Sequence, residues 1–175
     1  MPGFQFPARA LTCALLAGGL LAPAGAQTPV AGRSTGEVTA RVLQLVNKAR
    51  SEGRRCGAER FPPTAPLAAA PPLEAAAAAH ARDMAQRDYF AHRGKDGREP
   101  RDRVRAAGYA ARLTGENIAF GPDSAEEVVA GWLASAGHCA NLMDARFRHT
   151  GIGFATGRQA GHIYWVQTFG APGGA

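Results

Sequence analysis

The sequence predicts an α+β fold, a three-layer α-β-α sandwich with a small antiparallel sheet. Several segments carry apolar residues at helical spacing together with helix-capping signals. Near the C-terminus, GIGFATG and GHIYWVQTFG read as two strands of a hairpin that turns through residues 157–161. The second strand is apolar on both faces, which is typical of a strand covered on both sides. Helices on both faces of such a hairpin give three layers.

The N-terminal segment predicts export. Residues 11–21 are an apolar run too short to span a bilayer, and the AGA at residues 24–26 suits a signal-peptidase site. We therefore expect a signal peptide at residues 1–26, a flexible segment at 27–36, one domain at 37–170 and a short tail at 171–175. The mature protein is expected to be secreted or periplasmic and to have no transmembrane segment.

Capping signals and apolar stripes place two helices in the first half of the domain. A capping box of Ser34 and Glu37 begins the first, which ends at Gly53. Residues 54–72 contain five prolines and are expected to form a loop. The second helix begins near Pro72 and carries His80 on its apolar face, where a lone histidine is more often a hydrogen-bonded core residue than a ligand.

Two further helices are expected in the second half. Residues 100–107 form the third, which ends at Gly108. The fourth starts at a capping box of Ser124 and Glu127 and ends at Gly137, with a short helical turn after it at residues 141–145. His92 falls in the loop between the second and third helices, and His138 directly follows the fourth.

Two cysteines, Cys56 and Cys139, lie outside the expected signal peptide. A pair of cysteines in an exported protein predicts a disulfide, which here would close a loop of about 80 residues and stabilise the fold by roughly 4 kcal/mol in the chain-entropy model. The alternative is a catalytic pair of Cys139 with His138. Adjacent residues seldom face each other as a nucleophile and its base must, so the disulfide is favoured.

The chain is basic, with a formal net charge of +6, and four of its arginines crowd into residues 98–105. This patch is formed by Arg98, Arg101, Arg103 and Arg105. It indicates either attraction to anionic groups of the cell envelope or a solvated helix face. No nucleic-acid-binding motif accompanies it, so we expect no nucleic-acid partner.

Six blocks in a fixed order resemble the CAP superfamily, the group of cysteine-rich secretory proteins, antigen 5 and pathogenesis-related proteins. These blocks are HARDMAQRDYFAH, AGY, GENIAFG, VVAGWLASAGHCANLM, HTGIGFA and YWVQTFG. The resemblance covers about residues 37–170 and is strongest to the bacterial single-domain members, the SCP-like extracellular proteins. It implies an α-β-α sandwich with a cleft that holds two histidines and two acidic residues.

Three of those four cleft residues have counterparts in this chain. His92 in FAH matches the first histidine, Glu116 in GENIA the first acid, and His138 in AGHC the second histidine. The second acid normally follows the tryptophan of the fourth helix, where this chain reads WLAS at residues 132–135. The resemblance therefore implies an incomplete set.

Two imidazoles and one carboxylate can bind Zn²⁺ or another divalent metal with one open position. They can equally form a metal-free polar cluster, or Glu116 can have a purely structural role. The spacing of His92, Glu116 and His138 does not indicate a metal site by itself, so this expectation rests on the resemblance.

The function favoured by these observations is a non-catalytic, exported binding module. Its cleft would take a small apolar molecule, a lipid, an envelope component or a divalent metal. A metal-assisted hydrolase is the first alternative, because a histidine and a glutamate can activate water. A structural protein that interacts with the cell envelope is the second.

Overall fold

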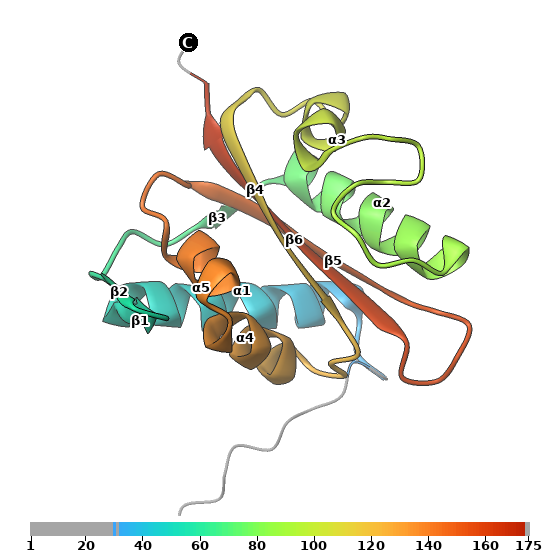
Figure 1. Ribbon diagram of the computed structural model, residues 1–175, viewed down its shortest axis with the longest axis horizontal. Helices are drawn as coiled ribbons and strands as arrows, with labels where there is room; N and C mark the ends of the chain where they lie inside the picture. Colours follow the sequence, from blue (N-terminus) through green and yellow to red (C-terminus); the bar gives the residue numbers. More distant parts are fainter. Residues whose placement is uncertain (1–29, 31, 174–175) are drawn as a thin grey trace, which may run out of the picture.

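The computed structural model describes residue 30 and residues 32–173, and it has the predicted three layers (Figure 1). Helices cover both faces of one sheet, so the α-β-α prediction is confirmed. One helical layer consists of α1 (Thr35–Glu52), α4 (Ala125–Ala134) and α5 (Ala136–Met143), and the other of α2 (Pro71–Arg87) and α3 (Pro100–Ala106). The expected signal peptide lies outside the described residues, as does part of the expected flexible segment. Among the described residues, no helix combines the length and apolar character needed to cross a membrane.

The sheet has four strands in the order β3-β5-β6-β4. Its members are β3 (Ala68–Ala69), β5 (His149–Thr156), β6 (Ile163–Pro172) and β4 (Ala111–Phe120). The predicted hairpin of β5 and β6 is confirmed, and β6 is buried along almost its whole length. Strand β4 pairs antiparallel with β6 and forms one edge of the sheet.

The larger core cluster lies between the sheet and the layer of α1, α4 and α5. Trp132 of α4 and Trp165 of β6 are both buried in it. On the opposite face, α2 packs unusually close to β5. A Cβ atom on Gly151 would lie 2.0 Å from the backbone carbon of Leu73, so the GIG motif provides the space that this helix needs.

Three details of the predicted secondary structure are wrong. The expected loop at residues 54–72 contains β3 and a separate two-stranded sheet of β1 (Arg54–Cys56) and β2 (Glu59–Phe61), and α2 begins at Pro71. Gly137 does not end the fourth helix. Ser135 is extended, with φ −92° and ψ 123°, so it ends α4 and begins α5, which contains Gly137 and His138. The turn expected at residues 141–145 overlaps the end of α5, which stops at Met143.

No strand is predicted from the sequence at residues 111–120, which β4 occupies. GENIAFG therefore lies on an edge strand and the bend after it. This placement determines how its two polar residues are directed.

Candidate functional site

Glu116 and Asn117 point to opposite faces of β4, because side chains alternate along a strand. Ile118, on the same face as Glu116, packs against α2. Asn117 faces the other layer, where its Nδ2 donates a hydrogen bond to the backbone oxygen of His138 in α5. Asn141 of α5 also donates to the Asn117 side chain. The edge strand thus holds a carboxylate on one face and is bonded to α5 on the other.

His92 is in direct contact with Glu116. Its Nδ1 lies 2.9 Å from Oε1 of Glu116, while about half of the His92 side chain is exposed. The loop that carries His92 is held to α2 through its backbone, since His80 Nε2 lies 2.9 Å from the carbonyl oxygen of Ala91. His80 is itself buried, as the core interpretation predicts.

Arg103 is the third member of this contact, and it was not predicted. Its Nη2 donates to Oε2 of Glu116 at 2.7 Å and to the backbone oxygen of His92 at 2.9 Å. Its Nη1 donates to the backbone oxygen of Arg98 at 3.0 Å. One guanidinium therefore joins α3, the loop of His92 and the edge strand.

The sequence offered little signal for this role. Arg103 is one of four arginines in residues 98–105, and nothing in the sequence around it indicates that it is the one directed inward. Arg103 and Arg105 both adjoin Val104, the buried residue of α3, so this neighbour does not distinguish Arg103 either.

His138 lies in the first turn of α5, beyond the other face of the edge strand. Burial lowers the pKa of His138, and the nearby charge of His92 lowers it further. The hydrogen bonds of the described residues include none between the His138 ring and Glu116. The structure thus joins two of the three predicted cleft residues directly, and it places the third near His92 from the neighbouring layer.

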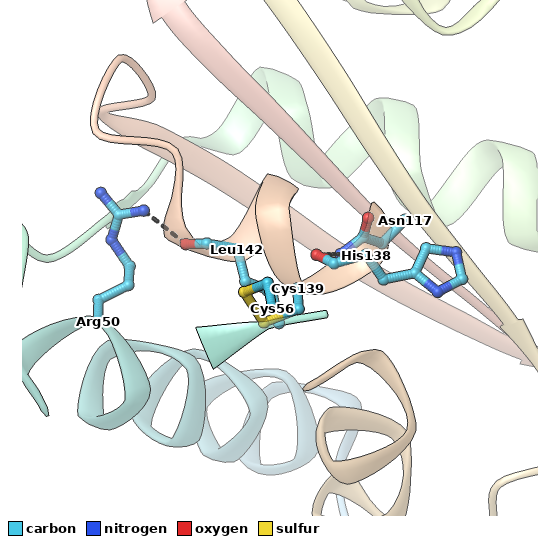
Figure 2. The surroundings of a disulfide bond; sticks show 6 residues. All are labelled: Arg50, Cys56, Asn117, His138, Cys139 and Leu142. Carbon is cyan, nitrogen blue, oxygen red and sulfur yellow. Dashed lines mark hydrogen bonds between the residues drawn. A yellow bond between two sulfur atoms is a disulfide. The ribbon is translucent and has the colours of Figure 1, made fainter. Parts of the chain in front are cut away.

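Helix α5, which carries His138, is held on several sides (Figure 2). The predicted disulfide is confirmed: Cys139 is bonded to Cys56 of β1, with their Cα atoms 5.4 Å apart. At the other end of α5, buried Arg50 donates to the backbone oxygen of Leu142 at 2.6 Å. The ring of His138 points away from the disulfide. A nucleophilic role for Cys139 is ruled out while this bond is intact, because its sulfur is not a free thiolate.

The site residues do not fit a three-ligand metal centre in this arrangement. Within residues 30 and 32–173, no group of three or more His, Cys, Asp or Glu side chains is arranged to hold a metal ion. Both oxygens of Glu116 already interact with groups of the chain, and one of those groups is a cationic guanidinium. A divalent ion at Glu116 would have to approach against that charge.

A hollow of about 250 Å³ opens beside the contact of His92 and Glu116. Its other lining residues come from the start of α3 and from β4: Glu99, Pro100, Arg101, Thr114 and Gly115. The arrangement can therefore offer a ligand a fixed imidazole edge and a partly shielded carboxylate in a shallow recess.

The comparisons with known proteins identify the family and the fold. The model of the cysteine-rich secretory protein family, CAP, matches residues 43–169. The chain belongs to the CAP family. Over 97 residues, this CAP-domain protein is 36% identical to the uncharacterized protein YkwD of Bacillus subtilis (strain 168). That match covers 55% of this chain and 36% of YkwD, so the chain corresponds to well under half the length of that relative.

Two solved structures have the same fold. An extracellular protein containing an SCP domain from Bacillus anthracis superposes with a TM-score of 0.64 at 25% identity, over 78% of this chain and 41% of that one. An outer surface protein from Borrelia burgdorferi also gives 0.64, at 18% identity over 85% of this chain and 100% of that one. These neighbours are extracellular or outer-surface proteins.

Proposed function

We propose that this CAP-domain protein is an exported binding module for a cell-envelope component, and that its cleft works without a tightly bound metal ion. The observation that carries the proposal is the pairing of Glu116 with both His92 and Arg103. This pairing compensates the buried carboxylate and fixes the imidazole, so the recess is organised before a ligand arrives. Preorganised polar groups bind at a lower entropic cost. The apolar run at residues 11–21 and the surface location of the neighbours support export.

Binding is tested by co-sedimentation of the mature protein with envelopes isolated from the native host. We expect His92→Ala to lose most of the binding, because this change removes the exposed side of the recess. His162→Ala is the matched control, since His162 packs on Phe120, outside the residues that line the recess. Wild-type retention by the His92 variant would contradict the proposal.

Metal independence is tested by zinc titration calorimetry at pH 7.5 and pH 5. We expect no saturable uptake by the wild type. In Arg103→Met, Glu116 is released from the guanidinium, so weak zinc binding should appear at pH 7.5 and be lost at pH 5, where imidazoles are protonated. A wild-type protein that binds one zinc ion, and loses it in both His92→Ala and His138→Ala, would instead support the three-ligand site predicted from the resemblance.

A hydrolase is the second candidate, and one contact favours it. Glu116 holds His92 Nδ1, which leaves Nε2 as the other nitrogen of the ring, in the way that a carboxylate orients a general base. A water molecule would have to serve as the nucleophile, because Cys56 and Cys139 are bonded to each other. Turnover of ester and peptide libraries that disappears in Glu116→Gln would support this candidate. Equal background in the wild type and Glu116→Gln would remove it.

A further inference from the structure

A groove extends from the recess of His92 and Glu116 along the seam between α3 and β4. The recess adjoins a second hollow of about 370 Å³, because Arg101 and Thr114 line both. The second hollow is completed by Asp102, Val104, Arg105, Tyr109, Ala110 and Ala111. We call the two hollows together the seam groove.

Two of the four clustered arginines, Arg101 and Arg105, line the seam groove, and the four arginines have different partners. Arg103 is directed inward to Glu116, and Arg98 pairs with Asp96 at 2.8 Å. Arg101 takes part in none of the ion pairs found in the described part of the chain. Arg105 is 83% exposed and lies 3.5 Å from Asp102, which is a weak, solvated pair.

Three acidic residues, Glu99, Asp102 and Glu116, line the seam groove, and each already has a partner. Oδ2 of Asp102 accepts a hydrogen bond from the backbone nitrogen of Glu99 as part of a capping box. Glu116 is paired with Arg103, and Glu99 lies 3.6 Å from Arg93, which lies outside the lining. Two arginines one helical turn apart therefore remain to meet a ligand, with their Cβ atoms about 6 Å from each other.

The far wall of the seam groove is rigid. The Tyr109 hydroxyl lies 2.7 Å from Nδ1 of His149. The Tyr109 ring lies over Gly170, where a Cβ atom would come within 2.6 Å of it. Tyr109, which lines the second hollow, is thus held in place from two sides.

We propose that the seam groove binds a linear polyanion of the cell envelope, a chain that carries carboxylate or phosphate groups and passes Arg101 and Arg105 toward His92. This inference names a ligand class for the proposed binding function and rests on it. Charge complementarity supports a polyanion. The concave shape favours a chain over a flat membrane, because a planar surface does not reach into two joined hollows. The spacing of the arginines suits anionic groups about 6 Å or more apart.

The test measures binding of the mature protein to polygalacturonate, which carries carboxylates, and to poly(glycerol phosphate), which carries phosphates. Neutral dextran and vesicles with anionic phospholipid are the comparison surfaces. We expect salt-sensitive binding to at least one of the two chains, none to dextran, and weaker binding to the vesicles. The chain bound more tightly identifies the anionic group.

Arg101→Ala/Arg105→Ala should weaken polyanion binding by about tenfold or more. It should also reduce the slope of log K against log salt by about two, one for each lost ionic contact. The matched control is Arg55→Ala/Arg60→Ala, which removes the same charge from the exposed β1–β2 ladder and should change affinity by less than about threefold. Arg101→Lys/Arg105→Lys should retain most of the binding, because it keeps the charges.

Equal losses from the two alanine pairs would overturn the proposal, since they would show attraction to net charge alone. Preference for vesicles over both chains would overturn it in favour of a membrane surface. Absence of binding to either chain would also overturn it. If envelope co-sedimentation still depended on His92 in that case, the proposed binding function would stand and this inference alone would fail.

Discussion

Nη2 of Arg103 lies 2.7 Å from Oε2 of Glu116, and the two side chains are 10% and 2% exposed. This is a buried ion pair beside the recess that His92 and Glu116 line. The pair explains why the glutamate of GENIAFG tolerates burial at a sheet edge. A buried carboxylate requires a partner charge and hydrogen bonds, and here one arginine supplies both.

Breaking this pair should be costly. Arg103→Met leaves Glu116 buried without its cation, so we expect the free energy of unfolding to fall by about 3–5 kcal/mol. Adding Glu116→Gln should recover part of this loss, because no isolated charge then remains. The measurement is urea unfolding followed by circular dichroism.

Arg98→Met is the matched control for that experiment. Its pair with Asp96 is exposed, so the expected change is within about 0.5 kcal/mol. Similar losses from the Arg98 and Arg103 variants, or no recovery in the double variant, would show that Arg103 and Glu116 are not energetically coupled.

The disulfide should be formed in the exported protein and should contribute to its stability. Cys56 and Cys139 are 83 residues apart in sequence, so the chain-entropy model gives about 4 kcal/mol. Thiol titration of denatured mature protein should find no free thiol. Cys56→Ala/Cys139→Ala should unfold at lower urea, and two free thiols per wild-type chain would contradict the prediction.

The sequence was sufficient for the layered fold because its helices carry strong caps and stripes. Ser34 and Glu37 form the predicted capping box, and Ser124 accepts a hydrogen bond from the backbone nitrogen of Glu127. Strand β4 was missed because Glu116 and Asn117 are polar and buried on opposite faces, so no alternation of apolar and polar residues appears. The side chains of Glu116 and Asn117 bond to groups far away in sequence, on α3, on α5 and in the loop of His92.

Only those residues of the candidate site that lie in motifs resembling the CAP superfamily could be predicted from the sequence. His92 and Glu116 lie in motifs that could be matched, and the structure joins them. Arg103 had no such marker, since its inward direction depends on how α3 sits against β4. Local periodicity carries no information on that packing.

The contact between α2 and β5 should depend on Gly151. A methyl group there would lie 2.0 Å from the backbone of Leu73, which cannot move aside as a flexible side chain could. We expect Gly151→Ala to destabilise the fold by about 3 kcal/mol or more, by forcing the two layers apart. Thermal unfolding measures this loss.

Gly131→Ala is the opposite case and serves as its control. Gly131 is exposed within α4, and an added Cβ would meet nothing within 4 Å. This change should stabilise the protein by about 0.5–1 kcal/mol through helix propensity. A Gly151 variant as stable as the Gly131 variant would mean that α2 is not held at this distance.

Acidification below about pH 6.5 should lower the free energy of unfolding, because two histidines have lowered pKa values in the folded protein. Burial lowers the pKa of His80, and the nearby charge of Arg103 adds to this effect against the opposing influence of Glu116 and Asp83. Burial also lowers the pKa of His138, with His92 as the second cause. The unfolded chain therefore binds more protons than the folded one in this window, so stability rises with pH and is lost as pH falls through the folded-state pKa values.

The unfolding free energy should be higher at pH 7.5 than at pH 5. His80→Gln/His138→Gln should flatten this dependence, even though its stability at pH 7.5 is expected to be lower than that of the wild type. An unchanged slope in the double variant would assign the acid sensitivity to other groups.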